Sequence, residues 1–338
     1  MAAALFVNVR KQREYRHTTH VQNLNDNEML ERYRFSNNGI NYLENLLLDD
    51  LKRPTHRSCA LSPKQQILIA LRFFATGSMY QVIGDTMGFN KGTVSRAVDS
   101  VTNALLGHFK DFVSWPTPDE KKKISTGFYQ LAGFPNVIGC IDGTHVRIQA
   151  PAGDEASYVN RKGFHSISVQ AVCDDKGRFT SVNASWPGSC HDSHIFRTSG
   201  LCHKLERENK AFSDGVLLGD SGYACRPFLM TPFLVTDTEG KVRYQQSHTR
   251  TRVTIERAFG QLKRRFHVLH SEIRLAPSKV CRVVCACVAL FNIAILLNEP
   301  ELDDWNQDEA VDLENEDIAD AERDGSTVRN FIVHQYFA

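Results

Sequence analysis

The sequence predicts an α/β protein in which helices flank a mixed sheet, preceded by an all-α region with a helix-turn-helix arrangement. Helical apolar spacing extends to residue 114, strand patterns fill much of 136–219, and an amphipathic helix follows. The order strand, strand, strand, helix, strand, helix is typical of a mixed sheet that helices cover. We therefore divide the chain into a flexible arm (1–26), a helical helix-turn-helix domain (27–114), an α/β domain (115–298) and an acidic tail with a terminal amphipathic segment (299–338).

The charge of the chain is unevenly distributed. The net charge is only +1, yet residues 299–324 contain thirteen Asp or Glu and a single Arg. Residues 1–298 contain 38 Lys and Arg against 26 Asp and Glu, an excess of twelve positive charges. A basic body favours polyanionic partners through neutralisation of their phosphates, although a merely solvated surface would give the same count. We therefore expect double-stranded DNA as a partner.

Cysteine usage and hydropathy indicate an intracellular protein. The nine cysteines are scattered without a CxxC pair or a Cys/His zinc spacing, so we interpret them as reduced thiols. The first residues lack the long apolar region of a signal peptide. The most apolar stretch, 280–297, contains Arg282 and Asn292, which favours a buried core helix over a membrane span. We expect no membrane partner and a nuclear location, with the cytoplasm left open.

The helical domain has recognisable start and stop signals. A helical pattern covers 28–51, and Ser62 with Pro63 then forms an N-cap and a first helical position. Gly88 ends a short second helix, and Asn90 caps a third. Helix, tight glycine turn and helix is a helix-turn-helix arrangement, although a plain three-helix bundle has the same pattern. The outer face of the third helix would meet DNA through Lys91, Thr93 and Arg96.

The period of the chain changes after the Trp-Pro-Thr-Pro sequence at 115–118, which marks a boundary. Residues 165–173 alternate between apolar and polar, and a turn at 174–177 leads into a further strand pattern. The predicted elements are strands at 136–148, 165–173, 178–186 and 215–219, and helices at 193–210 and 251–266.

Four acidic residues occupy four different settings in the α/β domain. Asp142 interrupts the first strand, Asp192 follows the third, Asp220 ends the fourth, and Glu256 lies on the last helix. A carboxylate there is costly to desolvate unless something compensates it, and hard cations prefer oxygen ligands. Functional groups also gather at the carboxyl ends of strands in such sheets. We therefore predict that the four acids hold two divalent metal ions, either Mg²⁺ or Mn²⁺, for phosphodiester chemistry.

The neighbours of Glu256 suit a site that a DNA backbone crosses. Arg252 and Lys263 lie near the same face of the helix, where we expect DNA contacts, and Gly260 leaves that face uncrowded. Spacing alone leaves ordinary readings open, because an Asp after a strand is usually a cap or turn residue, and Glu256 could be a salt-bridged surface acid.

Other polar residues near the acids allow two readings. Hydrogen bonding or phosphate contact is favoured over zinc for three histidines beside the acids, because no further ligand has a fitting spacing. Buried thiols are favoured over a metal site for the cysteines in the apolar helix. A DNA contact and a solvated loop are equally open for Arg161 and Lys162. The histidines and cysteines are His145, His191, His194, Cys281, Cys285 and Cys287.

Five long segments of the chain resemble the DDE endonuclease domain of the PIF/Harbinger transposases and of the nucleases derived from them. In order, they are VIGCIDGTHVRIQAP, YVNRKGFHSISVQAVCD, WPGSCHDSHIFRTS, LLGDSGYACRPFLMTPF and TIERAFGQLKRRF. The resemblance covers 115–298 and implies an RNase H-like fold, a divalent metal and cut-and-paste DNA chemistry. It matches Asp142, Asp220 and Glu256 with the three catalytic acids and Asp192 with a further metal ligand. The upstream helices resemble the family's helix-turn-helix.

The leading interpretation is a DNA endonuclease or transposase that hydrolyses phosphodiester bonds and, when active in transposition, joins the freed 3′-hydroxyl to target DNA. The alternative is a domesticated nuclease or DNA-binding scaffold that keeps the fold without transposition, and a third reading is a hydrolase of another phosphodiester. The resemblance implies a Myb-like DNA-binding partner protein, and we expect a homo-oligomer when the protein is active.

The acidic tail is expected to stay exposed, because residues 299–324 carry too much charge to bury. A solubilising linker, a shield for the basic cleft and a binding segment for a basic partner are all consistent with its composition. The last apolar piece, 328–337, is expected to dock on the body of the protein.

Overall fold

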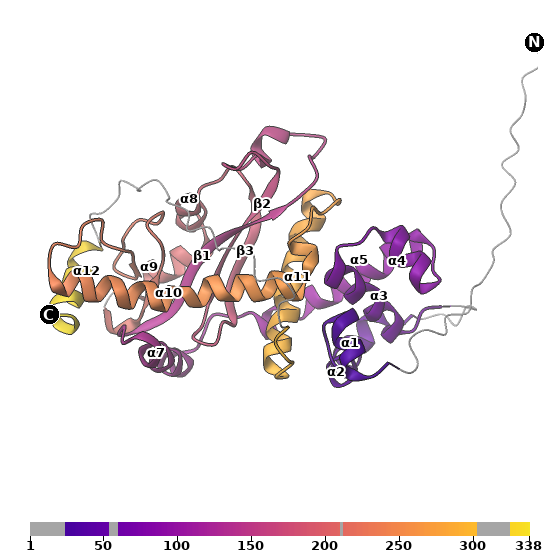
Figure 1. Ribbon diagram of the computed structural model, residues 1–338, viewed down its shortest axis with the longest axis horizontal. Coiled ribbons are helices and arrows are strands. Elements are labelled where there is room, and N and C mark those ends of the chain that lie inside the picture. Colours follow the sequence, from indigo (N-terminus) through magenta and orange to yellow (C-terminus); the bar gives the residue numbers. More distant parts are fainter. Residues whose placement is uncertain (1–23, 54–59, 210–211, 303–324) are drawn as a thin grey trace, which may run out of the picture.

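The computed structural model describes four stretches of the chain, residues 24–53, 60–209, 212–302 and 325–338 (Figure 1). The first helices form one part of the molecule, and a five-stranded sheet with its covering helices forms the other. The apolar helix α11 (Pro277–Leu296) contacts both parts, through α5 and β3. The α/β class and the mixed sheet flanked by helices are therefore confirmed.

The capping signals predicted at Ser62, Gly88 and Asn90 are confirmed. The Ser62 side chain accepts a hydrogen bond from the backbone N–H of Gln65, and that of Asn90 accepts one from Thr93. Gly88 ends its helix in the left-handed conformation, with φ of 76°. The helices are α1 (Asp26–Tyr33), α2 (Asn37–Leu51), α3 (Pro63–Thr76), α4 (Tyr80–Met87) and α5 (Lys91–Gly107).

The prediction of one helical pattern over 28–51 was wrong, because two helices occupy this stretch. Arg34 adopts a left-handed φ of 66° and ends α1, and the Ser36 hydroxyl then caps α2 by accepting from Gly39 N at 3.1 Å. Helix α1 begins at Asp26, within the predicted arm, and residues 1–23 of that arm lie outside the described residues.

The predicted break at 115–118 separates two helices, α6 (Phe109–Phe112) and α7 (Pro118–Ala132). Thr117 and Glu120 form a capping box at the start of α7, with Glu120 accepting from Thr117 N at 2.8 Å. Helix α7 contacts the first strand, so it belongs to the packing of the sheet.

The sheet is mixed, with the strand order β3-β2-β1-β4-β5. Strand β2 pairs antiparallel with both β1 and β3, whereas β4 runs parallel to β1 and β5 runs parallel to β4. The four predicted strands are confirmed to within one residue, and β5 is an addition too short to show alternation. The strands are β1 (Val137–Arg147), β2 (Ser166–Cys173), β3 (Phe179–Pro187), β4 (Val216–Leu218) and β5 (Leu229–Met230).

The helical region predicted at 193–210 is two short helices, α8 (Asp192–Arg197) and α9 (Gly200–Glu208). The Ser199 side chain lies between them and accepts a hydrogen bond from Cys202 N at 3.0 Å, which caps the second helix. The available signal was the dipeptide Ser199-Gly200, which is typical of turns and which the prediction of one helical region did not use.

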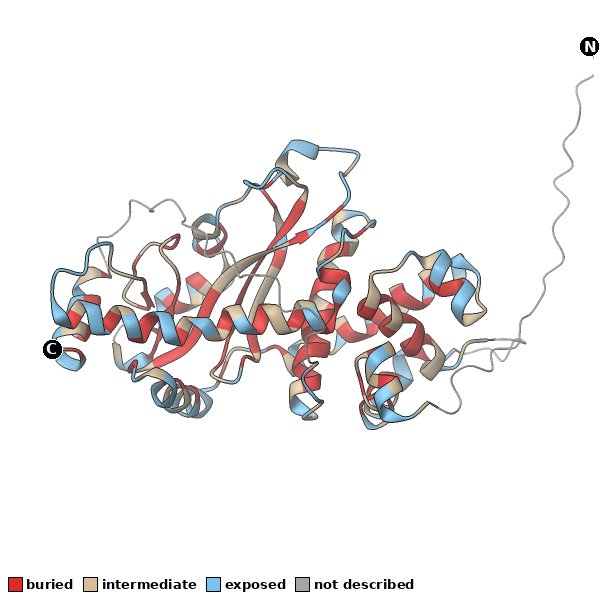
Figure 2. Cartoon of the chain, viewed as in Figure 1, coloured by how far each residue is buried: buried red, intermediate tan, exposed pale blue. Residues whose placement is uncertain are grey.

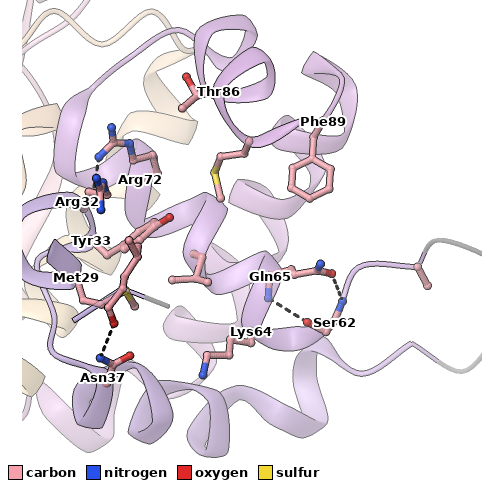
Figure 3. A pocket seen from close by; sticks show the side chains of 14 residues that line it. Met29, Arg32, Tyr33, Asn37, Ser62, Lys64, Gln65, Arg72, Thr86 and Phe89 are labelled. Carbon is pink, nitrogen blue, oxygen red and sulfur yellow. Dashed lines mark hydrogen bonds between the residues drawn. The ribbon is translucent and has the colours of Figure 1, made fainter. Parts of the chain in front are cut away.

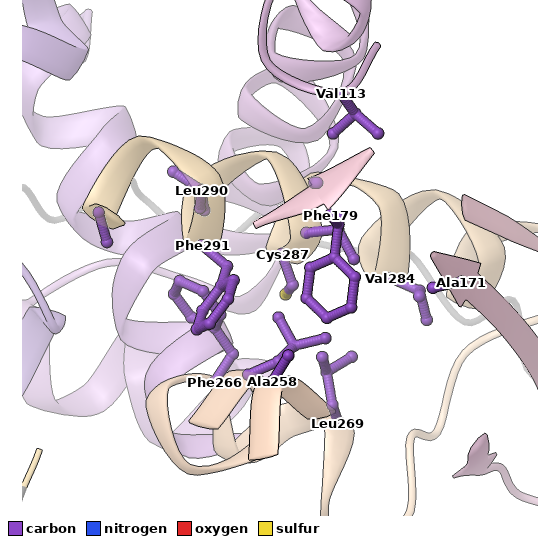
Figure 4. Packing of buried hydrophobic residues seen from close by; sticks show 14 of the residues in the cluster. Val113, Ala171, Phe179, Ala258, Phe266, Leu269, Val284, Cys287, Leu290 and Phe291 are labelled. Atoms are coloured by element: carbon purple, nitrogen blue, oxygen red, sulfur yellow. The ribbon is translucent and has the colours of Figure 1, made fainter. Parts of the chain in front are cut away.

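Each face of the sheet has its own hydrophobic core, because successive side chains of a strand point to opposite faces. Cys140 of β1 belongs to the larger core, which α7, α10 and α11 cover. Its neighbour Ile141 belongs to a smaller core with Phe196 of α8 and Leu205 of α9. Figure 4 shows part of the larger core, including Phe179, Ala258, Val284, Cys287 and Phe291.

Helix α10 (Glu239–Arg265) is longer than the predicted 251–266, beginning twelve residues earlier after the N-cap Thr238. Figure 2 shows it buried along one side and exposed along the other. The added turns bury Tyr244 and His248, which an apolar pattern does not register. The helix was underestimated because its first half is mostly polar.

Helix α11 is the predicted core helix. It is long and apolar enough to cross a membrane by length and composition, but most of it is buried within the fold (Figure 2). Asn292 is buried as well, where its side chain donates to the carbonyl oxygens of Phe112 at 2.8 Å and Phe179 at 2.7 Å. The polar residue therefore has a structural function inside an apolar helix.

The end of the chain docks on α10, as predicted for 328–337. Helix α12 (Ser326–Tyr336) contacts α10, and Arg243 Nε donates to Phe337 O at 2.8 Å. At the start of the acidic tail, the Glu299 carboxylate accepts from Ser36 N at 3.0 Å and Ser36 Oγ at 2.7 Å, so this acid is not simply exposed. Residues 303–324 lie outside the described residues.

Candidate active site

Asp142 and Asp220 lie where the parallel pairing of β1 and β4 stops. The register ends with Cys140 opposite Leu218, and each aspartate comes two residues further along its own segment. Both side chains are half-buried. The two carboxylates therefore project beyond the carboxyl end of β4, which is the place where sheets of this kind collect functional groups.

Glu256 reaches the same place from α10, through an arginine. Arg252 Nη1 lies 2.9 Å from Asp142 Oδ2, and its second terminal nitrogen pairs with Glu256 Oε1. All three side chains are largely shielded from solvent. The guanidinium thus joins an acid of the sheet to an acid of the helix.

Lys263, which lies two turns after Glu256 on α10, also contacts the first strand. Its Nζ donates to Thr144 Oγ1 at 2.8 Å and to His145 O at 3.0 Å. Arg252 and Lys263 were predicted to contact DNA, and in the structure both side chains bind residues of the site itself. Their contact with DNA stays a prediction.

Asp192 is the first residue of α8 and lies directly over Gly143. A Cβ atom at Gly143 would fall 2.3 Å from both carboxylate oxygens of Asp192, so this residue can approach β1 only because position 143 lacks a side chain. Gln170 Nε2 donates to Asp192 O at 2.9 Å and to Tyr223 Oη at 3.0 Å, which fixes the start of α8 to the loop after β4.

Gln170 and Tyr223 are buried site residues that the sequence analysis did not single out. Gln170 is the last of three polar residues that alternate with apolar ones in β2, and this alternation was the available signal. Its function depends on a partner 53 residues away, which the sequence pattern does not disclose.

The electrostatics show that the aspartates converge. Burial raises the pKa of Asp142 to about 7; the positive charge of Arg252 opposes this rise, and the negative charges of Asp220 and Asp192 add to it. Burial also raises the pKa of Tyr223, and Asp192, Asp142 and Asp220 raise it further. The same three carboxylates therefore act on both groups.

The donor set fits a hard divalent cation, because all four acids offer carboxylate oxygens and the charges of Asp220 and Asp192 disfavour that of Asp142. Arg252 supplies the positive charge between Asp142 and Glu256. Within the stretches that the structure describes, no three His, Cys, Asp or Glu side chains are already spaced as ligands of one ion. Binding of a metal would therefore require Arg252 to give up at least one of these contacts.

The three histidines near the acids have separate partners. His145 Nδ1 lies 3.0 Å from Ser166 Oγ, and His191 Nδ1 lies 2.5 Å from a guanidinium nitrogen of Arg161. His194 packs edge-on against Trp186, with ring centroids 5.3 Å apart. Among the described residues, the three histidines therefore do not belong to one group of ligand-type side chains. Cys281, Cys285 and Cys287 are free thiols on α11.

The predicted DNA contacts of the helical part lie on α5, away from the carboxylates. Lys91 and Arg96 are exposed, Thr93 is half-buried, and an Arg96 Nη2 donates to Thr93 Oγ1 at 3.3 Å. Helix α11 lies between this part and the sheet (Figure 1). The structure therefore does not bring this group together with the acids.

We expect Gly143→Ala to displace the Asp192 carboxylate while leaving the fold intact, because the new Cβ would collide only with the end of a side chain. Misplacing a site group by about 1 Å can cost about a hundredfold in rate, so we expect a loss of that order in DNA cleavage. Gly153→Ala is the matched control, since a Cβ there meets no atom within 4 Å. Equal cleavage rates for the two variants would show that the position of Asp192 is unimportant.

Comparisons with known proteins identify relatives of the chain. The model of the DDE superfamily endonuclease family matches residues 141–292, which contain all four acids. The chain is 37% identical over 290 residues to the Bos taurus protein named "Putative nuclease HARBI1", covering 85% of this chain and 82% of that protein. The Homo sapiens protein of the same name is 36% identical with the same coverage.

A plant protein is similar at a lower level. "Protein ALP1-like" of Arabidopsis thaliana is 29% identical over 264 residues, covering 72% of this chain and 63% of that protein. No solved structure matches the chain. The family match, the identities and the coverage together show where the chain belongs: it is a member of the PIF/Harbinger family of DDE transposases and the nucleases derived from them.

Proposed function

We propose that this protein is a metal-dependent DNA endonuclease of the DDE type. The observation that carries the proposal is geometric: Asp142 and Asp220 follow the last pairing of β1 with β4, Asp192 lies over Gly143, and Glu256 is joined to Asp142 through Arg252. Asp142, Asp220 and Glu256 are the proposed catalytic acids, and Asp192 is a further ligand. The family match over the same segment supports these assignments.

The architecture supports the two finer parts of the proposal. Three antiparallel strands followed by two parallel ones, with helices on both faces, are consistent with an RNase H-like fold. The α3–α4–α5 arrangement, with cations on the exposed face of α5, is consistent with a helix-turn-helix that binds double-stranded DNA through its last helix.

The four acids would hold two ions, Mg²⁺ or Mn²⁺. When bound, such ions activate a water or a 3′-hydroxyl and stabilise the leaving oxygen. The protein's own contribution is positional. Gln170 fixes the start of α8 against the loop after β4, and Lys263 fixes α10 to β1. Both contacts hold elements from distant parts of the chain at one reaction centre.

Strand transfer would use the same centre, because a 3′-hydroxyl freed by hydrolysis can replace water as the attacking group. A domesticated scaffold without turnover is the second candidate. One observation favours it: Arg252 pairs with both Asp142 and Glu256, two of the proposed metal ligands. The two candidates differ in a single measurable property, the cleavage of DNA.

We further propose the nucleus, with the cytoplasm also open, as the location and a homo-oligomer as the active form, with a Myb-like DNA-binding protein as an assisting partner. The excess of twelve positive charges over residues 1–298 supports a DNA partner. The resemblance to the family supports the Myb-like partner.

Nicking of supercoiled plasmid tests the proposal. The full chain should convert the plasmid to nicked and linear forms in Mg²⁺ or Mn²⁺, and EDTA should abolish the conversion, because uncompensated carboxylates would repel the substrate's phosphates. Binding without cleavage under every metal condition would select the scaffold. Cleavage that persists in EDTA would overturn the metal-dependent reading.

A further inference from the structure

A second small cavity adjoins the acids on the side of α8. Its volume is about 40 Å³, and two loops form it, one around 160–162 and one at 188–191, with His145 of β1 and Asp192 completing its wall. A larger cavity lies between α1, α3 and α4 (Figure 3). Of these two cavities, the smaller one is lined by an acid of the proposed reaction centre.

The first loop is held rigidly by one buried amide. Asn160 is only 5% exposed, and its Oδ1 accepts from Lys162 N at 3.0 Å and Phe164 N at 3.3 Å. Its Nδ2 donates to Ser166 Oγ at 3.2 Å, and the same hydroxyl lies 3.0 Å from His145 Nδ1. The loop and the strand below it therefore form one hydrogen-bonded unit.

The second loop is pressed against the first through a glycine. A Cβ at Gly188 would fall 2.2 Å from Ser166 Oγ and 2.7 Å from Tyr158 O, so the close approach excludes any side chain at this position. Ser189 N also donates to Ser157 O at 3.2 Å. Both walls of the cavity are thus fixed before any ligand binds, which lowers the entropic cost of binding.

Arg161 gives the cavity its positive charge. This residue is exposed, its guanidinium donates to His191 Nδ1, and it has no carboxylate partner among the described residues. Lys162 and the imidazoles of His145 and His191 line the same cavity. A guanidinium with free N–H groups beside imidazoles matches a phosphate, whereas a carbohydrate or an apolar group would leave the charge unused.

We propose that this cavity binds one backbone phosphate of the cleaved strand, next to the phosphate that is hydrolysed, with Arg161 as its principal contact. The placement follows from Asp192, which belongs both to the cavity wall and to the proposed ligand set. The contact sets the register of the strand over the acids. It rests on the proposed nuclease function and identifies part of its substrate-binding surface.

Binding of a labelled DNA duplex by Arg161→Ala gives the first test. Both this variant and the reference chain carry Asp142→Asn, and fluorescence anisotropy is followed across a salt series. Loss of one charge-assisted phosphate contact should weaken binding about tenfold and lower the salt slope by about one. Arg207→Ala, an exposed arginine on α9 outside the cavity, is the matched control. Asn160→Ala should weaken binding without changing the slope, because it loosens the loop and keeps the charge.

Cleavage of duplexes with single neutral methylphosphonates gives the second test, because each cut fixes the register. The otherwise unmodified chain should avoid cutting at one fixed distance from the neutral group, and Arg161→Ala should cut weakly everywhere with no such gap. If the protein neither binds nor cuts DNA, the proposed function falls, and this inference falls with it. If it cuts DNA but Arg161→Ala behaves like Arg207→Ala in both tests, only the inference is overturned.

Discussion

Asp142→Asn should abolish cleavage of supercoiled DNA while leaving DNA binding nearly unchanged. The amide has the shape of the carboxylate and lacks the negative charge that a divalent ion requires. Because a catalytic ion contributes several kcal/mol to the transition state, we expect a loss of about a thousandfold or more in rate. The measurement is the nicking rate in Mg²⁺ and Mn²⁺, with affinity for a labelled duplex measured in parallel.

The fold should tolerate this change. Asp142 is half-buried, and burial raises its pKa to about 7; Arg252 opposes this rise and other carboxylates add to it. Removing the charge therefore relieves repulsion between carboxylates and disrupts no hydrophobic core. Asp119→Asn serves as the control, since its side chain is 89% exposed on α7. Wild-type cleavage by Asp142→Asn would refute the assignment of the first acid. A large loss in Asp119→Asn as well would mean that the assay reports something other than the site.

Asn292→Leu should destabilise the protein by more than any surface substitution. The side-chain amide satisfies three backbone groups, accepting from Phe179 N at 2.9 Å and donating to the carbonyls of Phe179 and Phe112. Each buried polar group left without a partner costs about 1–3 kcal/mol, so we expect a loss of about 3 kcal/mol or more. The midpoint of thermal unfolding should fall by roughly 6 °C or more.

The comparison requires a polar residue without this function. Asn103→Leu on the exposed side of α5 makes the same chemical change without leaving a buried backbone group unpaired. It should change the free energy of unfolding by less than about 1 kcal/mol. Matching midpoints for the two leucine variants would mean that water or local rearrangement satisfies the groups around Asn292, and the account of the core would need revision.

Features that depend on neighbouring residues could be predicted from the sequence. The caps at Ser62 and Asn90 and the ends of the four longer strands depend on local chemistry, and the structure reproduces them. The division at Arg34 was missed, because a left-handed arginine has no sequence signal comparable to a glycine. The polar first half of α10 was missed because its buried side chains, such as Tyr244 and His248, are not aliphatic.

The geometry of the site could be predicted less well, because it depends on pairs far apart in the sequence. The four acids were identified one by one, but the contact that joins two of them spans 110 residues from Arg252 to Asp142. Helical spacing placed Arg252 near Glu256 and suggested DNA as its partner, since the position of β1 relative to α10 was unknown. The contribution of Gly143, which makes space for Asp192, depends on the same long-range packing.

The docking of α12 has a practical consequence for handling the protein. Phe337 O accepts from Arg243, and Gly325 lies so close to Arg226 that no larger residue would fit there. Arg243 and Glu256 belong to one unbroken helix, α10. A purification tag or fluorescent label fused after the last residue would therefore lie against the helix that carries an acid of the reaction centre, and could displace it. Inactive preparations of such a fusion would therefore be poor evidence against enzymatic activity.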